Sequence, residues 1–233
     1  MNFNSYLEEL NIEPSAEILN KFKTYYEYLV EVNEYMNLTA ITQEDEVYIK
    51  HFYDSLLLSK YYNLKDEKKT LCDVGAGAGF PSIPLAICFP NLEVTIIDAL
   101  QKRIGFLNKL IEKLGLKNVK ALHYRAEDFA KIKRESFDIV TARAVARLNV
   151  LSELCIPLVK TGGNFIALKG DDINEVIEAK KATDILGAKY TNDYADELPL
   201  DMGKRTIIIY EKIKNTPNRY PRAFAVIKKT PLK

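Results

Sequence analysis

The sequence has no tryptophan and only three cysteines among its 233 residues. Cys72, Cys88 and Cys155 show no CxxC spacing, so we expect no disulfide framework, and with only two histidines we expect no metal site either. No run approaches the ~18 consecutive apolar residues of a membrane span. The first ten residues also lack the basic and apolar regions of a signal peptide. We therefore expect a cytoplasmic protein without membrane contact.

Net charge is nearly absent, with 33 Lys and Arg against 32 Asp and Glu, but it is unevenly distributed. Residues 204–233 contain nine Lys and Arg against Glu211, a net charge of +8, whereas residues 1–50 contain ten acids against three lysines, a net charge of −7. Clustered positive charge raises the local potential and so predicts a polyanionic partner. A solvated, poorly ordered end that binds nothing would give the same pattern.

Apolar residues form 47% of the chain, enough for the core of one large α/β domain. Residues 18–32 repeat apolar side chains at helical spacing, Asn37 to Thr39 ends this helix, and a second helix is predicted over residues 44–62. From residue 70, short apolar runs alternate with helical segments, which predicts βαβ units in a doubly wound, mostly parallel sheet. The predicted strands cover residues 71–74, 94–97, 119–122, 139–140, 165–168 and 206–210.

Three glycines follow the first predicted strand at alternate positions, Gly75, Gly77 and Gly79, with Asp73 two residues before them. Parallel α/β sheets bind ligands at the carboxyl ends of their strands. A dinucleotide fingerprint, G-x-G-x-x-G, would need glycine where this chain has Phe80. S-adenosylmethionine carries no phosphate, and its ammonium could be attracted by Asp73. This combination favours S-adenosylmethionine, and the alternative is a tight turn that needs glycine only for its dihedral angles.

Two later segments also fit an S-adenosylmethionine site at the carboxyl ends of the strands. Asp98 ends the second predicted strand, where a carboxylate can accept both ribose hydroxyls, although it would serve a nicotinamide cofactor equally well. Arg125 to Asp128 follows the third strand, where a loop would reach the adenine. That segment could also simply cap a helix.

Further motifs follow one another along nearly the whole chain. They are Asn37–Ile41, His51–Leu56, Asp73–Pro84, Asp98 with Lys102-Arg103 and Phe106-Leu107, Arg125–Glu127, Ala142–Ala144, Ala167–Gly170, Thr216-Pro217 and Tyr220–Arg222. In this order they resemble the bacterial small-subunit ribosomal RNA guanine-N7 methyltransferases, also called the glucose-inhibited division protein B family. The Asn-Leu-Thr, His-x-x-Asp-Ser and Lys-Gly pieces are specific to that family.

The resemblance implies a class I, Rossmann-like methyltransferase fold that uses S-adenosylmethionine. It also implies one guanine in a decoding-region loop of the small-subunit (16S) ribosomal RNA as the target. Residues 1–66 would form an N-terminal helical extension, residues 67–212 the S-adenosylmethionine-binding core, and residues 213–233 a basic tail. The cofactor contacts that the resemblance implies are Gly75, Phe80, Ala126, Glu127 and Arg143, with Arg143 near the methionine end.

Guanine N7 holds an in-plane lone pair and no proton, so its methylation needs no general base. The enzyme then has only to align N7 with the methyl group and the sulfur, and we expect Arg143 to orient cofactor and base together. Because N7 lies on the major-groove edge, which proteins cannot reach in A-form RNA, the target must be unpaired or splayed out. The predicted RNA-binding residues are Lys102, Arg103, Arg147, Lys169, Arg219 and Arg222, each of which could instead be an ordinary surface charge.

Some alternatives stay open. His51 and Asp54 share one helix face, and they either line the site or fix the N-terminal helices to the core, of which we favour the second. A small-molecule methyltransferase would leave the basic tail without a purpose. A nicotinamide-dependent oxidoreductase disagrees with Phe80 and Asp73, and a non-catalytic RNA-binding assembly factor would not need the intact glycine loop. We expect a monomer, and the sequence does not distinguish naked ribosomal RNA from the small ribosomal subunit as substrate.

Overall fold

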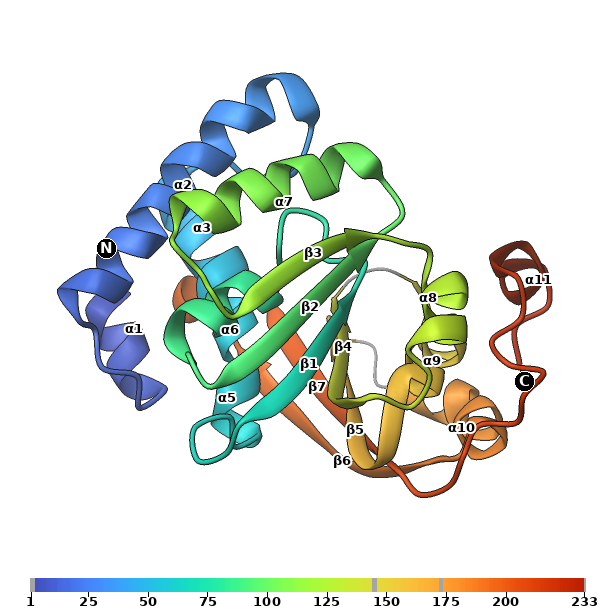
Figure 1. The fold of residues 1–233 in the computed structure, drawn as a ribbon. Helices are drawn as coiled ribbons and strands as arrows, with labels where there is room; N and C mark the ends of the chain where they lie inside the picture. Colours follow the sequence, from blue (N-terminus) through green and yellow to red (C-terminus); the bar gives the residue numbers. More distant parts are fainter. Residues whose placement is uncertain (1–2, 144–145, 172–173, 233) are drawn as a thin grey trace.

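The computed structural model describes residues 3–143, 146–171 and 174–232. Its centre is a seven-stranded sheet in the order β3-β2-β1-β4-β5-β7-β6 (Figure 1). Strands β1 to β5 are parallel, and β7 pairs antiparallel with both β5 and β6. The strands are β1 (Lys69–Val74), β2 (Leu92–Asp98), β3 (Val119–His123), β4 (Phe137–Arg143), β5 (Val159–Lys169), β6 (Ala188–Glu197) and β7 (Lys204–Lys212).

Helices cover both faces of this sheet. On one face lie α1 (Phe3–Glu9), α2 (Ala16–Met36), α3 (Glu44–Val47), the π-helix η1 (Tyr48–Tyr53), α4 (Asp54–Leu56), α5 (Leu58–Tyr61), α6 (Ser82–Cys88) and α7 (Gln101–Lys113). On the other lie α8 (Ala126–Ile132), α9 (Leu148–Cys155), the 3₁₀-helix η2 (Ile156–Leu158), α10 (Asn174–Leu186) and α11 (Phe224–Lys229). A last 3₁₀ turn, η3 (Pro199–Asp201), joins β6 to β7. No helix within the described ranges is long and apolar enough to cross a membrane.

Alternate residues of each central strand point into two different apolar cores, one on each face of the sheet. Leu71 and Ile139 point into the core under the N-terminal helices, whereas their neighbours Cys72 and Val140 point into the core under α9 and α10. This follows from the period of two in a β-strand, and both faces are apolar because both are covered. The proposed extension over residues 1–66 therefore shares one continuous core with the sheet.

The six predicted strands are confirmed, and the doubly wound α/β class is confirmed with them. The strand β6 was not predicted because its sequence is polar. It is one of the two edge strands, and most of its residues are exposed. Since only one side of an edge strand pairs, polar side chains are tolerated there.

The predicted break after the long helix is confirmed. Asn37 adopts a left-handed conformation with φ of 51°, and the side-chain oxygen of Asn33 accepts the amides of Leu38 (2.7 Å) and Thr39 (2.9 Å). The second predicted helix, over 44–62, is not one regular helix. The π-helix η1 interrupts it between α3 and α4, a feature that is frequent at functional sites.

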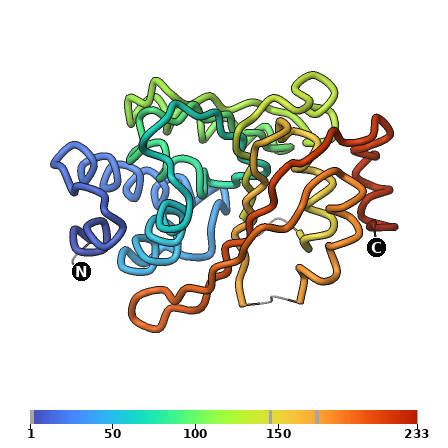
Figure 2. Tube along the Cα trace, turned by 90° about the horizontal axis from the view of Figure 1, so that it is seen from below, coloured from blue at the N-terminus to red at the C-terminus, as the bar shows by residue number. Residues whose placement is uncertain are grey.

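The C-terminal segment is packed. Tyr220 and Ile227 are buried, and Arg134 donates to the carbonyl oxygens of Thr216 (2.6 Å) and Tyr220 (2.8 Å). Figure 2 shows the segment at the end of the molecule opposite the N-terminal helices. The alternative of a loose, solvated end therefore does not hold for residues 213–232.

Candidate active site

The glycine loop lies at the centre of the sheet, at the carboxyl end of β1. Strands β2 and β4 lie on opposite sides of β1, so the order in which successive strands are added to the sheet reverses here, as at the ligand sites of open α/β sheets. Gly75, Gly77 and Gly79 have φ angles of 76°, 62° and 104°, which favour glycine. A Cβ on Gly79 would lie 2.7 Å from Ile83, whereas one on Gly77 would meet no atom within 4 Å. The backbone at Gly77 is therefore open to a ligand.

The N-terminal helices hold this loop in place. Tyr25 of α2 donates its hydroxyl to the carbonyl oxygen of Ala78 at 2.6 Å, and its ring stacks on Phe80 with centroids 5.4 Å apart. The helical spacing of apolar residues over 18–32 predicts only that Tyr25 lies on an apolar helix face. Its polar role depends on a partner 53 residues away, which periodicity does not reveal.

Asp73 is completely buried behind the loop. Its Oδ2 accepts the Ser82 amide at 3.3 Å, and its Oδ1 has no hydrogen-bond partner among the described residues. Burial raises the pKa of Asp73 to about 7, while its contact with Ser82 opposes that rise. The site thus contains an unsatisfied acceptor, which is rare in a folded interior and suits a group that can donate.

Asp98, at the end of β2, is engaged within the protein. Its Oδ1 accepts the Leu100 amide (2.9 Å), and its Oδ2 accepts the Gly77 amide and an Arg103 N–H, both at 3.3 Å. A carboxylate offers about four lone-pair sites, so one site on Oδ1 stays available. The structure thereby joins the predicted ribose acceptor to the glycine loop and to Arg103.

The predicted adenine contacts begin α8. Ala126 is buried, and the Glu127 side chain is nearly so. Glu127 Oε1 accepts the amide of Phe224 at 3.3 Å and lies 3.9 Å from Arg125. This contact connects the third loop of the site to the C-terminal segment.

Arg143, at the end of β4, lies at the centre of a buried cluster. It donates to Asp54 Oδ2 (3.0 Å) and to the carbonyl oxygen of Lys50 (3.2 Å), and its Nη2 is 3.3 Å from His51 Nδ1. Its guanidinium lies 4.8 Å from the centre of the Phe80 ring. Ala144, the last residue of that motif, lies outside the described residues.

His51 and Asp54 complete this cluster. The His51 ring stacks on Phe80 at 4.5 Å, and its Nε2 is 2.8 Å from Thr39 Oγ1. Burial, together with the Arg143 cation, lowers the pKa of His51 to about 3, so the ring is neutral near pH 7. The second oxygen of Asp54, Oδ1, accepts a hydrogen bond from Arg205 Nε at 3.0 Å. His51 and Asp54 therefore connect the N-terminal helices to the core through Arg143, and Asp54 also does so through Arg205.

The predicted RNA-binding residues fall into two groups. Lys169 and Arg222 use their donors inside the protein: Lys169 binds Glu175 (2.8 Å) and the carbonyl oxygen of Ala146, and Arg222 binds the buried Glu153 through two nitrogens (2.8 and 2.6 Å). The other four leave more of their side chains accessible. Lys102 and Arg219 are exposed, Arg147 is exposed in an ion pair with Glu178 (3.2 Å), and Arg103 is partly exposed beside Asp98.

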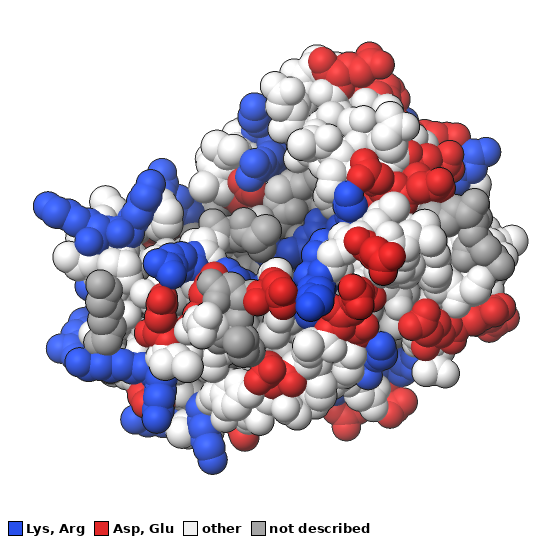
Figure 3. Space-filling model, turned by 180° about the vertical axis from the view of Figure 1, so that it is seen from behind, with Lys and Arg blue, Asp and Glu red and all other residues white. Residues whose placement is uncertain are grey.

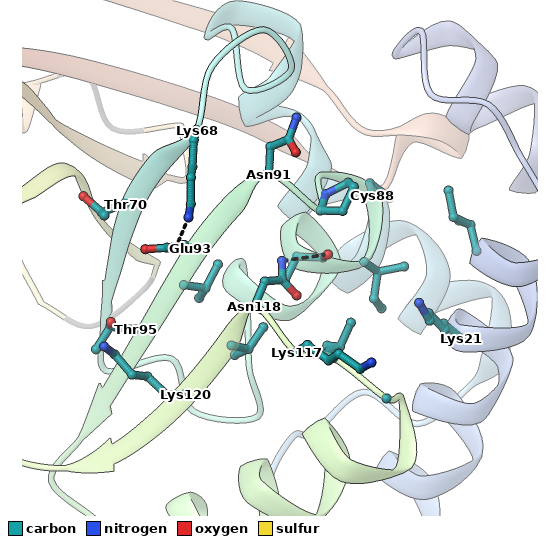
Figure 4. Close-up of a pocket in the computed structure, with 18 of the residues that line it drawn as sticks. Lys21, Lys68, Thr70, Cys88, Asn91, Glu93, Thr95, Lys117, Asn118 and Lys120 are labelled. Atoms are coloured by element: carbon teal, nitrogen blue, oxygen red, sulfur yellow. Dashed lines mark hydrogen bonds and ion pairs between the residues drawn. The ribbon is translucent and has the colours of Figure 1, made fainter.

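Charge is divided across the molecule as the sequence predicts. Figure 3 shows Lys and Arg gathered on the side formed by the C-terminal segment, and Asp and Glu more frequent over the N-terminal helices. A large groove of about 1120 Å³, shown in Figure 4, lies elsewhere. Its lining includes Thr70, Glu93 and Asn118, which are at the amino ends of β1, β2 and β3. It therefore lies at the edge of the sheet opposite the glycine loop.

Comparisons with known proteins agree with this geometry. A family model described as GidB, rRNA small subunit methyltransferase G, matches residues 18–194. Over 233 residues the chain is 54% identical to Ribosomal RNA small subunit methyltransferase G of Bacillus cereus (strain B4264), covering 99% of this chain and 97% of that protein. It is 53% identical to the protein of the same name from Geobacillus sp. (strain WCH70), covering 99% and 98%.

Solved structures share the fold. The YcgJ protein of Bacillus subtilis superposes with a TM-score of 0.56 at 14% identity, covering 71% of this chain and 100% of that one. TYW2 from M. jannaschii, solved in complex with AdoMet, superposes with a TM-score of 0.52 at 20% identity, covering 64% and 71%. At these identities the likeness establishes the class I methyltransferase architecture and nothing finer.

Proposed function

This chain belongs to the rRNA small subunit methyltransferase G family, and we propose that it transfers a methyl group from S-adenosylmethionine to N7 of one guanine in the ribosomal RNA of the small subunit. The observation that carries the proposal is Arg143, whose largely buried side chain is fixed by Asp54 and lies over the Phe80 ring beside the glycine loop. A rigid cation at this place can orient two reactants without exchanging a proton, since arginine stays protonated.

The residues around the glycine loop fit the cofactor. When bound, S-adenosylmethionine supplies an electrophilic methyl group on a positively charged sulfonium. The unpartnered Asp73 Oδ1 suits its ammonium, and Arg143 suits its carboxylate. The open backbone at Gly77 allows close approach, and the remaining site on Asp98 Oδ1 suits a ribose hydroxyl. The proposed cofactor set is Asp73, Gly75, Gly77, Gly79, Phe80, Asp98, Ala126, Glu127 and Arg143.

The protonation states around Arg143 support attack by a group that carries no proton. His51 is a very weak base, with a pKa of about 3. Asp73 is a stronger base, but its one free oxygen, Oδ1, is the atom that we assign to the cofactor ammonium, so it is not available to a substrate. Methylation of an exocyclic amine or a hydroxyl would need a proton acceptor in reach, whereas guanine N7 needs only alignment.

The substrate guanine must be unpaired or splayed from its stack for N7 to enter the site. We propose that the accessible Lys102, Arg103, Arg147 and Arg219 contact the RNA backbone. Lys169 and Arg222 would support the surface through their ion pairs with Glu175 and Glu153. We also propose that the protein acts as a cytoplasmic monomer, with the division at residues 66 and 212 that the sequence predicts.

A methyl-transfer assay tests this function. The protein is incubated with labelled S-adenosylmethionine and small ribosomal subunits that lack the modification, and the digested RNA is analysed by mass spectrometry. We expect 7-methylguanosine at a single site, abolished by Arg143→Ala and unaffected by Lys23→Ala, a change on an exposed helix surface. Cofactor binding without label in the RNA would overturn the RNA assignment, in favour of a small-molecule methyltransferase or an assembly factor.

A further inference from the structure

A second groove runs between α9, α10 and α11 on the basic side of the molecule. It has a volume of about 1120 Å³. Val150, Ile177 and Phe224 give it an apolar lining, and Ile177 is 77% exposed. An isoleucine that exposed at the wall of a groove offers apolar surface that no described part of the chain covers.

Three lysines accompany this apolar lining. Lys180 and Lys181 of α10 and Lys228 of α11 are exposed, and their side chains form no ion pair or hydrogen bond within the described part of the chain. Two acids also line the groove: Glu178 is paired with Arg147, and Asp184 is exposed. Positive charge therefore exceeds negative charge, and the three unpaired lysines suit phosphate groups.

The groove starts next to the candidate active site. Ala146 and Arg147 are part of its lining, and they follow Arg143 by three and four residues. Three residues span at most about 11 Å, so an RNA strand that leaves the candidate active site can enter the groove directly. Lys169, at the end of β5, donates to the carbonyl oxygen of Ala146 at 3.0 Å and so ties this part of the groove to the sheet.

We propose that this groove binds the single-stranded RNA that flanks the target guanine, an inference that rests on the proposed function. Phosphates would contact Lys180, Lys181 and Lys228, while one base would lie against the apolar lining. Single-stranded nucleic acids are bound in this way, by a positive groove along the backbone together with apolar or aromatic surface for the bases. The unpaired charge and the direct continuation from Arg143 favour RNA over an acidic protein.

The test compares two triple variants with equal loss of charge. Lys180→Ala, Lys181→Ala and Lys228→Ala remove the groove lysines. Lys117→Ala, Lys120→Ala and Lys133→Ala remove three exposed, unpaired lysines at the opposite groove of Figure 4. Affinity for the naked small-subunit RNA and for small ribosomal subunits is measured at low and high salt. Single-turnover methylation, cofactor affinity and melting temperature are measured alongside.

Each single-strand phosphate contact contributes about 0.7 to the slope of log affinity against log salt, so losing three contacts lowers the slope by about 2. Between about 50 and 200 mM salt, wild type should lose about 20-fold more affinity than the groove variant. The opposite-groove variant should match wild type, and both should keep the cofactor affinity and melting temperature of wild type. Ile177→Ser should weaken RNA binding without changing the slope.

The outcomes separate this inference from the proposed function. If wild type methylates the RNA and both triple variants lose RNA affinity equally, the proposal that this groove binds RNA is overturned, because net charge alone would then explain the loss. If the groove variant binds naked RNA normally but small subunits poorly, the occupant is a ribosomal protein and the inference is again overturned. If wild type places no methyl group on RNA, the proposed function itself fails.

Discussion

At the scale of single residues, the buried carboxyl of Asp73 makes stability depend on pH. Its pKa is about 7 in the folded protein against an ordinary value of 3.8. The folded state therefore holds a proton that the unfolded state has lost, and stability falls as pH rises from about 4 to 7. Above that window the loss is about 4 kcal/mol. Asp73→Asn should unfold at higher urea concentration than wild type at pH 8, and this advantage should shrink towards pH 4.

His51 gives the opposite slope. Because its pKa is lowered from 6.5 to about 3, its contribution to stability is present at neutral pH and is lost as pH falls through that interval. The pH windows of Asp73 and His51 overlap, so wild type should show a flatter profile of stability against pH than either group alone would give.

The control for Asp73→Asn is Glu17→Gln, which alters an exposed ion pair with Lys21 and should not be more stable than wild type at pH 8. An Asp73→Asn protein less stable than wild type at pH 8 would contradict this account.

The roles of His51 and Asp54 illustrate what residue patterns leave undecided. Their spacing predicted a shared helix face, but the partners that define their function lie on β4 and β7. Arg205 was counted only as part of the basic C-terminal charge. In the structure it pairs with the same carboxylate as Arg143. Contacts between residues about 90 and 150 positions apart follow from the topology of the sheet, which spacing along the chain does not encode.

At the scale of elements, two glycines of the glycine loop, Gly77 and Gly79, look alike in sequence but have different roles. Gly77→Ala adds strain of about 1 kcal/mol at its φ of 62°, and places a methyl group where the backbone is open to the cofactor. Gly79→Ala adds strain and also collides with Ile83 and Tyr25, at a total cost of about 3 kcal/mol. We expect Gly77→Ala to lose S-adenosylmethionine affinity with a small drop in melting temperature, and Gly79→Ala to lose mainly stability. Calorimetry and thermal unfolding distinguish the two.

A matched control is available in Gly115, which has the same φ of 62° and no atom within 4 Å of an added Cβ. It lies just after α7, at the amino ends of the strands, so Gly115→Ala should reproduce the strain of Gly77→Ala without affecting cofactor affinity. Equal cofactor binding by Gly77→Ala and wild type would show that the cofactor does not approach that backbone.

Elements differ in how well the sequence predicts them. Buried strands such as residues 71–74 and 94–97 are predicted because both of their faces must be apolar. The edge strand β6 escapes prediction, since one of its sides pairs with nothing and its residues stay polar. The π-helix η1 also escapes, because it lies between two short α-helices and differs from them in its hydrogen bonds, which composition does not reveal. That local change brings His51 and Asp54 to Arg143, so the least predictable turn supports the most important arginine.

At the scale of the whole molecule, the opposite charges of the two ends have a structural counterpart. The acidic helices hold the glycine loop and Arg143, and the basic C-terminal segment forms one wall of the groove that leads away from them. A polyanion approaching this protein is therefore steered towards the C-terminal side. The segment also reaches the proposed cofactor site, through the hydrogen bond from the Phe224 amide to Glu127.

The C-terminal segment is consequently not a detachable tail, and its removal should damage the fold. Deleting residues 213–233 exposes the core that Tyr220 and Ile227 cover and takes Thr216 from Lys212, a buried lysine that also binds Glu135. Burial of two such side chains alone contributes at least about 3 kcal/mol. We expect the truncated protein to melt well below wild type, and Lys214→Ala, an exposed change in the same segment, to melt with wild type. If the truncated protein instead kept the wild-type melting temperature and lost only RNA affinity, the segment would be an independent RNA-binding arm. The positive charge of this segment, rather than its packing against the core, would then account for its role.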